Sequence, residues 1–112
     1  MKITAEHRGP VTIVAIEGSV DALTAGEAAA FLSARIQAGA HRLVADLSLI
    51  EYMSSAGLRV FLAAFKEARQ AGGDLRLAAA QDNVQRMLNT AGFTSILKFY
   101  ADVDAAVASF AS

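Results

Sequence analysis

Two adjacent serines, Ser54 and Ser55, have the residue type and position in this chain that best suit chemistry. They follow an apolar segment that ends near Leu47, and they open a segment with helical periodicity. A serine at a helix start can accept hydrogen bonds from the first free backbone N–H groups, and the helix dipole there favours an added negative charge. The pair therefore suggests a phosphate switch in which Ser55 is modified and its surroundings bind a partner only when it is unmodified.

The simpler interpretation is that Ser54 or Ser55 only caps the helix, a role worth about 1 kcal/mol and, on spacing alone, the commoner one. Position favours the switch, because functional sites of open α/β sheets lie at the carboxyl ends of strands, in loops that lead to helices. Gly57 also favours it. A glycine in a first helical turn costs roughly 1 kcal/mol relative to alanine, so we expect another group to approach the backbone closely there.

Two aspartates occupy related positions. Asp21 follows another predicted strand and precedes another predicted helix, so it is a candidate to lie beside the serines; a turn or capping role is the alternative. Asp46 stands inside an otherwise apolar strand. A buried carboxylate must be hydrogen-bonded, and we expect Asp46 to anchor the loop that follows Leu47.

The sequence lacks the common catalytic patterns. It has no Gly-x-Ser-x-Gly elbow and no Gly-x-x-x-x-Gly-Lys phosphate loop. His7 and His41 do not have the spacing of metal ligands, and neither is placed by the sequence near Ser55. We therefore expect a non-enzymatic binding module without cofactor or metal, with a small serine-dependent enzyme as the alternative of a different class.

The composition indicates one cytoplasmic domain. The 112 residues have a net charge of −1 and scattered lysines and arginines, which argues against a nucleic-acid surface. The absence of cysteine excludes disulfides and thiolate chemistry. The apolar run from Val60 to Phe65 is far shorter than the ~20 residues that span a bilayer, and Met1 to His7 has no signal-peptide core, so we expect no membrane insertion.

Alternation of strand and helix patterns predicts an α/β fold in which right-handed crossovers pack the helices on a sheet. The segment from His41 to Leu47 is apolar on both faces, as expected at the centre of a mixed or parallel sheet. A turn signal at 8–10 separates the first two strands, and a short loop is predicted between Leu47 and the serine pair. Gly92 is expected to end the third helix, with Phe93 folding back on it. The predicted strands are 3–7, 11–17, 41–47, 74–79 and 95–100, and the predicted helices are 24–38, 55–71, 82–91 and 102–110.

Four segments resemble the STAS domain, the module of bacterial anti-sigma factor antagonists. They are Gly18–Asp21, Asp46–Ser48, Tyr52–Leu58 and Asn89–Phe93. The third is the diagnostic one, where the family motif is typically Asp-Ser-Ser/Thr-Gly-Leu. The resemblance covers nearly the whole chain and implies a single STAS-like domain over 1–112, with a mixed sheet of four to five strands covered by about four helices.

In such proteins the first serine of the motif is phosphorylated by the anti-sigma factor, which is a protein kinase. Aligned on Gly57, that acceptor is Ser55; Ser54 replaces the usual aspartate and is the alternative acceptor, and Ala56 replaces the second hydroxyl residue. Asp21 matches an aspartate of the partner-binding surface. That surface is expected to comprise Asp21, Thr24, Ser54, Ser55, Ala56, Gly57, Arg59 and Val60.

The resemblance implies partner switching. The unmodified protein captures the anti-sigma serine/threonine kinase and frees a sigma factor, phosphorylation ends the capture, and a phosphoserine phosphatase restores the active form. An alternative within the family is a small cytoplasmic subunit of a lipid-transport ATPase complex, which binds the ATPase without a phosphorylation switch. For Arg59 and Val60, the alternative to partner contact is a solvated arginine and a partly buried valine. The sequence defines no oligomeric state.

Overall fold

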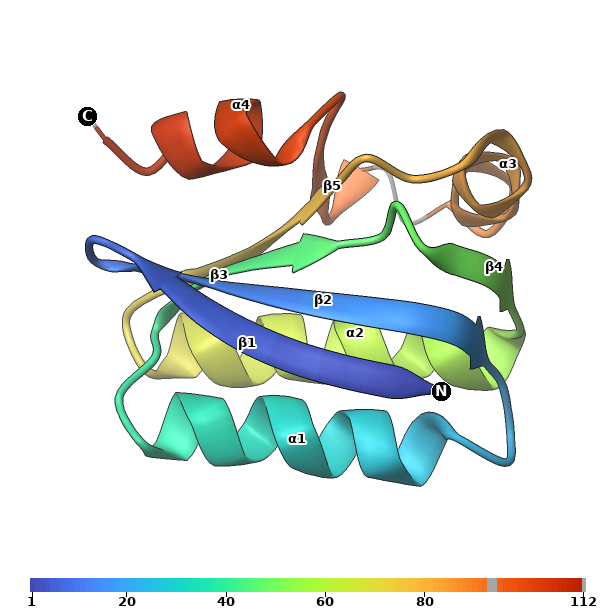
Figure 1. Ribbon diagram of the computed structural model, residues 1–112, viewed down its shortest axis with the longest axis horizontal. Coiled ribbons are helices and arrows are strands. Elements are labelled where there is room, and N and C mark those ends of the chain that lie inside the picture. Colours follow the sequence, from blue (N-terminus) through green and yellow to red (C-terminus); the bar gives the residue numbers. More distant parts are fainter. Residues whose placement is uncertain (93–94, 112) are drawn as a thin grey trace.

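A six-stranded mixed sheet runs through the computed structural model, which describes residues 1–92 and 95–111 (Figure 1). The order across the sheet is β1-β2-β3-β5-β6, and β4 pairs with β2 off this path. The predicted α/β class is confirmed. The strands are β1 (Lys2–Arg8), β2 (Val11–Val20), β3 (Arg42–Asp46), β4 (Ile50–Met53), β5 (Asp74–Ala78) and β6 (Lys98–Tyr100). The helices are α1 (Ala25–Gln37), α2 (Ser55–Gln70), α3 (Asp82–Thr90) and α4 (Val103–Ala108).

β1 and β2 form an antiparallel hairpin, whereas the other strand pairs are parallel. Arg8 pairs with Val11, and Gly9 between them has a φ of 61°. Glycine adopts this left-handed conformation without the steric cost that other residues incur, so the predicted turn is confirmed. The other end of β1 brings Met1 close to Gly18, whereas the chain ends beyond α4 on the far side of the molecule (Figure 1).

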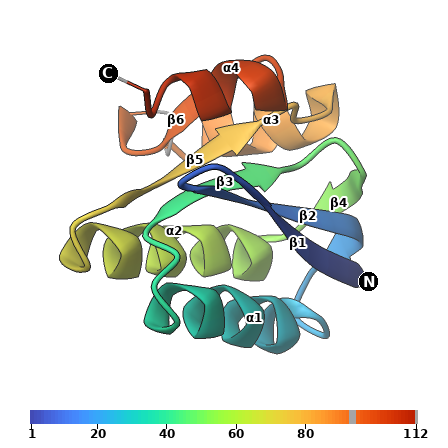
Figure 2. The same ribbon diagram turned by 60° about the vertical axis from the view of Figure 1, so that its left-hand side comes forward.

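β3 lies at the centre of the sheet because its side chains are apolar on both faces. Leu43, Val44 and Ala45 are fully buried between β2 and β5. Leu43 and Ala45 belong to the larger core with α1 and α2, while Val44 belongs to a smaller core with α4. Helices thus cover both faces of the sheet: α1 and α2 lie side by side on one face and α4 lies on the other (Figures 1 and 2).

Two segments differ from the sequence prediction. Residues 50–53, predicted as a loop, form β4, which pairs in parallel with residues 18–20 of β2 across a register shift. Two of its four residues, Glu51 and Tyr52, are exposed. The strand therefore has too few buried positions to show the two-residue alternation of apolar and polar side chains that is typical of strands. The predicted strand at 95–100 is a strand only at Lys98–Tyr100. The expected placement of Phe93 lies outside the described residues.

Candidate functional site

The serine pair lies at the start of α2, at the edge of the sheet where parallel strands end (Figure 1). β4 ends at Met53, and the backbone N–H of Ser54 donates to the carbonyl oxygen of Val20 at 3.0 Å. This bond joins the start of α2 to the end of β2. The site therefore has the location expected from the sequence, with β4 leading into it in place of a loop.

Ser54 is the residue that caps α2. Its hydroxyl oxygen accepts hydrogen bonds from the backbone N–H groups of Ala56, at 3.2 Å, and Gly57, at 3.4 Å. Its backbone is extended, as is usual for a cap residue. Sequence reasoning left open whether Ser54 or Ser55 has this role, and the geometry assigns it to Ser54.

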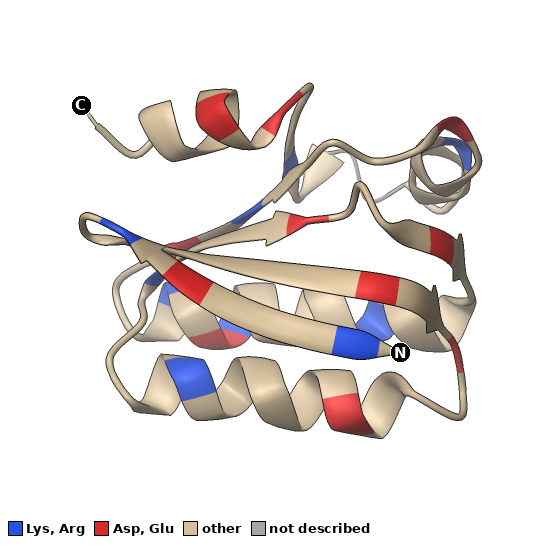
Figure 3. Ribbon diagram, in the orientation of Figure 1, with Lys and Arg blue, Asp and Glu red and all other residues tan. Residues whose placement is uncertain are grey.

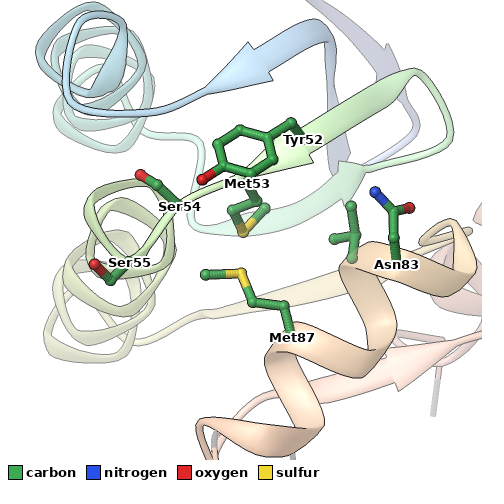
Figure 4. A pocket seen from close by; sticks show the side chains of 7 residues that line it. Tyr52, Met53, Ser54, Ser55, Asn83 and Met87 are labelled. Carbon is green, nitrogen blue, oxygen red and sulfur yellow. The ribbon is translucent and has the colours of Figure 1, made fainter.

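Ser55 is the first residue of α2, and its side chain is exposed. Its hydroxyl makes no hydrogen bond to any residue in the described ranges 1–92 and 95–111, so it is free to react. Figure 4 shows both serine hydroxyls at the opening turn of the helix. The first turn of α2 contains no acidic side chain, so nothing on this turn opposes an added negative charge, which the helix start favours.

Gly57 fits where another residue would not. A Cβ atom at this position would collide with the carbonyl oxygen of Val20 and would lie 2.9 Å from Val20 Cγ1 and 3.0 Å from Met53 Cγ. The predicted close approach at Gly57 is thereby confirmed, and the approaching group is the backbone of β2. The first turn of α2 is thus seated directly on the end of β2.

Asp21 lies in the loop between β2 and α1 and bonds within that loop. Its Oδ1 accepts from the backbone N–H of Leu23 at 2.9 Å, and its own backbone N–H donates to Thr24 Oγ1 at 3.0 Å. The Thr24 hydroxyl in turn donates to the carbonyl oxygen of Ser19 at 2.8 Å. The turn role, which sequence reasoning gave as the alternative for Asp21, is therefore present, and Thr24 shares it.

Asp46 has the anchoring role that was predicted. Its Oδ1 accepts from the backbone N–H of Ser48 at 3.0 Å, which fixes the chain directly after β3. The next contact along this segment is made by the residue before α3: Gln81 Nε2 donates to the carbonyl oxygen of Ser48 at 2.8 Å. Asn83 Nδ2 likewise donates to the carbonyl oxygen of Glu51 at 2.8 Å. The chain that leads into the serines is thus held by Asp46 at the end of β3 and by the two side chains at the start of α3.

The two flanking candidates on α2 differ in accessibility. Arg59 is exposed and available to a partner. Val60 is 6% exposed and packs in the larger core with Phe61, so its expected place on the partner-binding surface is wrong. The apolar stripe of α2 is wider than the spacing of its largest residues indicated, and Val60 lies within it.

A cleft of about 400 Å³ opens beside the serines, between β4 and α3. Figure 4 shows the side chains of Met53 and Met87 directed toward each other at its floor, with the ring of Tyr52 above them. Sequence reasoning missed Tyr52 and Met87 as site residues; their signals were the position of Tyr52 in the serine motif and of Met87 on the apolar face of α3. The cleft is lined by Tyr52, Met53, Ser54, Ser55, Asn83, Val84 and Met87.

The two histidines lie away from the serines. His7 is on β1, where its Nδ1 lies 3.3 Å from Thr12 Oγ1, and His41 precedes β3, at the end of that strand opposite the site. Within the part of the chain that the structure describes, no three histidine, aspartate or glutamate side chains gather as metal ligands would. Charged side chains of both signs are dispersed over the elements (Figure 3).

None of the helices in the described ranges is both long enough and apolar enough to cross a membrane.

The family model of the STAS domain matches residues 2–106 of this chain. The chain belongs to the STAS domain family. Two similar proteins have names that describe a function. BtrV of Bordetella bronchiseptica, provisionally named an anti-sigma factor antagonist, is 36% identical over 98% of this chain and 95% of its own length. The anti-sigma F factor antagonist of Paenibacillus polymyxa is 29% identical over 89% of this chain and 86% of its own length.

Solved structures share the fold of this STAS domain. An anti-sigma factor antagonist from Mycobacterium paratuberculosis superposes with a TM-score of 0.90 at 22% identity, over 99% of this chain and 94% of that one. The Bacillus cell fate determinant SpoIIAA in its phosphorylated form gives a TM-score of 0.75 at 16% identity, over 97% and 99%. The STAS domain of a SulP transporter from Vibrio cholerae gives 0.70 at 18% identity, over 90% and 79%. At these sequence identities, the structural similarity shows only that the fold is shared.

Proposed function

We propose that this STAS domain is an anti-sigma factor antagonist that works in the cytoplasm by partner switching. Unmodified, it binds an anti-sigma factor with serine/threonine kinase activity and so frees a sigma factor. The kinase transfers the γ-phosphoryl group of ATP to Ser55 Oγ, the hydroxyl proton is lost, and ADP leaves. The modified protein is released, and a phosphoserine phosphatase hydrolyses the ester to restore binding. Relatives named as anti-sigma factor antagonists support the assignment of this class.

The observation that carries the proposal is the exposed Ser55 hydroxyl on a rigid helix start. Ser54 caps the helix and Gly57 seats it on β2, so Ser55 is held in one place without being engaged itself. Ser55 is the better acceptor of the two serines, because the Ser54 oxygen is half-buried and already accepts two backbone hydrogen bonds. A kinase can reach Ser55 without disturbing the fold.

A phosphate on Ser55 can end binding through its charge alone. It adds about −1.5 to −2 charges and three acceptor oxygens. Leaving one such charge desolvated and unpaired in an interface costs roughly 2–5 kcal/mol, which weakens binding by about 30-fold to several thousand-fold. The helix dipole offsets only about 0.3–1 kcal/mol, and it does so in the free protein as well. No refolding of the domain is needed.

Two measurements test the proposal. Incubation with ATP and extract of the native cell should add about 80 Da, one phosphoryl group, to the wild-type protein and nothing to Ser55→Ala. The anti-sigma factor, purified from that cell, should bind Ser55→Ala tightly and Ser55→Asp much more weakly. Equal affinities for the two variants would defeat the electrostatic account.

The same two measurements, with a labelling experiment and the variant Ser54→Ala added, separate the other candidates. A subunit of a lipid-transport ATPase complex would gain no mass and would retain the ATPase whether residue 55 is Ala or Asp. A serine-dependent enzyme would be labelled at Ser54 or Ser55 by a fluorophosphonate. A mass gain on Ser55→Ala but not on Ser54→Ala would move the acceptor to Ser54.

A further inference from the structure

Leu23 projects into solvent beside the serine site. It lies in the loop between β2 and α1, and 94% of its surface is exposed. Most leucines of the described chain are buried in the core, and the other markedly exposed one, Leu49, keeps nearly half of its surface covered. Single exposed apolar residues are common on protein surfaces, so exposure alone assigns Leu23 no role.

The loop holds Leu23 in a fixed position. The backbone N–H of Leu23 donates to Asp21 Oδ1 at 2.9 Å, and the N–H groups of Thr24 and Ala25 donate to the carbonyl oxygen of Asp21 at 3.2 and 2.8 Å. The Thr24 hydroxyl ties the same loop to the carbonyl oxygen of Ser19 at 2.8 Å. Because these bonds already order the loop, a partner that covers Leu23 restricts only the rotamers of its side chain and not the backbone.

Leu23 and the serines share one end of the molecule. The loop begins directly after Val20, whose carbonyl oxygen accepts from the backbone N–H of Ser54, and Figures 1 and 2 show the loop and the start of α2 at the same end. Tyr52, which is 54% exposed, pairs with Ser19 on the neighbouring strand. The loop that carries Leu23 and the strand that carries Tyr52 thus lie at the same end of the domain as Ser55, where one docking protein can cover all three.

We propose that Leu23 is the apolar anchor of the surface around Ser55, and that Asp21 is a positioning residue that acts on the partner through Leu23. This rests on the proposed function, so the occupant is the anti-sigma factor, which presents an apolar pocket next to the place that receives Ser55. The half-buried Asp21 carboxylate already accepts the Leu23 N–H, and this bond needs an acceptor oxygen at residue 21 but no charge.

The test measures the affinity of the purified anti-sigma factor for five variants. Leu23→Ala should bind roughly tenfold or more weakly, with an unchanged melting temperature because the side chain packs on nothing. Asp21→Asn keeps the acceptor oxygen and should bind like wild type, whereas Asp21→Ala should bind as weakly as Leu23→Ala. The double variant Asp21→Ala/Leu23→Ala should lose little more than either single variant. Ile96→Ala, an exposed apolar residue next to β6 at the opposite edge of the sheet, should bind like wild type.

Several results would overturn the proposal. If Leu23→Ala bound within about twofold of the wild-type affinity, Leu23 would not be an anchor. If Ile96→Ala lost as much affinity as Leu23→Ala, the loss would not be specific to the surface around Ser55. If Asp21→Asn bound as weakly as Asp21→Ala, with effects additive to Leu23→Ala, Asp21 would contact the partner through its charge. In each of these cases the proposed function stands as long as wild type binds and Ser55→Asp does not. Failure of wild type to bind the anti-sigma factor would overturn both.

Discussion

Ser54 and Ser55 are neighbours of identical chemistry with different structural roles. The Ser54 oxygen satisfies two backbone N–H groups at the start of α2, whereas the exposed Ser55 hydroxyl bonds to no residue of the described chain. Free donors at a helix start are costly unless a side chain or water satisfies them. One serine therefore stabilises the helix while the other is left available for modification.

This division predicts different stabilities for two alanine variants. Ser54→Ala should lower the free energy of unfolding by about 1 kcal/mol, the usual value of a cap, and so lower the melting temperature by about 4 °C. Ser55→Ala should melt like wild type. Thermal unfolding followed by circular dichroism measures both, and Ser54→Asp, which can still cap, serves as control. A larger loss for Ser55→Ala than for Ser54→Ala would contradict the assignment.

At the scale of elements, the seat of α2 on β2 fixes the site. Gly57 allows the helix backbone to approach Val20 more closely than a side chain permits. The Ser54 N–H bond to the Val20 carbonyl closes the same junction at 3.0 Å. The β2–α1 loop starts from this point, so α2, β2 and the loop that carries Leu23 are joined where the partner is proposed to dock.

Gly57→Ala should therefore be strongly destabilising. The new methyl group meets a backbone oxygen that cannot rotate away, so we expect a cost in the upper part of the usual range for overpacking, about 2–3 kcal/mol. This exceeds the gain in helix propensity of roughly 1 kcal/mol. Gly26→Ala is the matched control, because a Cβ there has no neighbour within 4 Å and α1 should gain stability. Chemical denaturation of both variants measures the difference. A Gly57→Ala protein as stable as Gly26→Ala would show that α2 can lift from β2 at no cost.

Sequence reasoning predicted most of the elements because their signals are strong and local. The two-sided apolar pattern of β3, the turn between β1 and β2, and the stripe of α2 each follow from a short window of residues. β4 was missed because its four residues depend on a distant partner, the last residues of β2. The burial of Val60 was missed for a similar reason: the width of a buried stripe depends on how closely a helix approaches its sheet.

The site could be located from the sequence but not resolved in detail. Asp46 and Gly57 have the predicted roles because a carboxylate in an apolar strand and a glycine in a first helical turn each require a specific neighbour. Which serine caps the helix depends on backbone angles that neither residue type dictates. The bond from Asp21 to the Leu23 N–H, and the exposure of Leu23, depend on the path of the loop, which the sequence does not encode in any periodic pattern.

For the whole molecule, the arrangement predicts a switch without a change of shape. The start of α2 is held by the Ser54 cap, the Gly57 contact, and the bonds from Gln81 and Asn83 to the chain around β4. A charge at position 55 projects outward from this rigid end. Ser55→Asp should therefore keep the melting temperature of wild type, with changes in amide hydrogen exchange confined to the first turn of α2 and its immediate neighbours. Altered exchange in α4, on the other face of the sheet, or in β6, at the edge of the sheet away from β2, would contradict a local mechanism.

The position of Met1 has a practical consequence for assays. The hairpin returns this residue to Gly18, near the same rim as the loop and the serines. An affinity tag or fluorescent protein fused to Met1 would sterically hinder a partner protein. The assay would then report weaker binding that has nothing to do with the variant under test. Reporters are better attached after α4, where the bulk of the domain separates them from that rim.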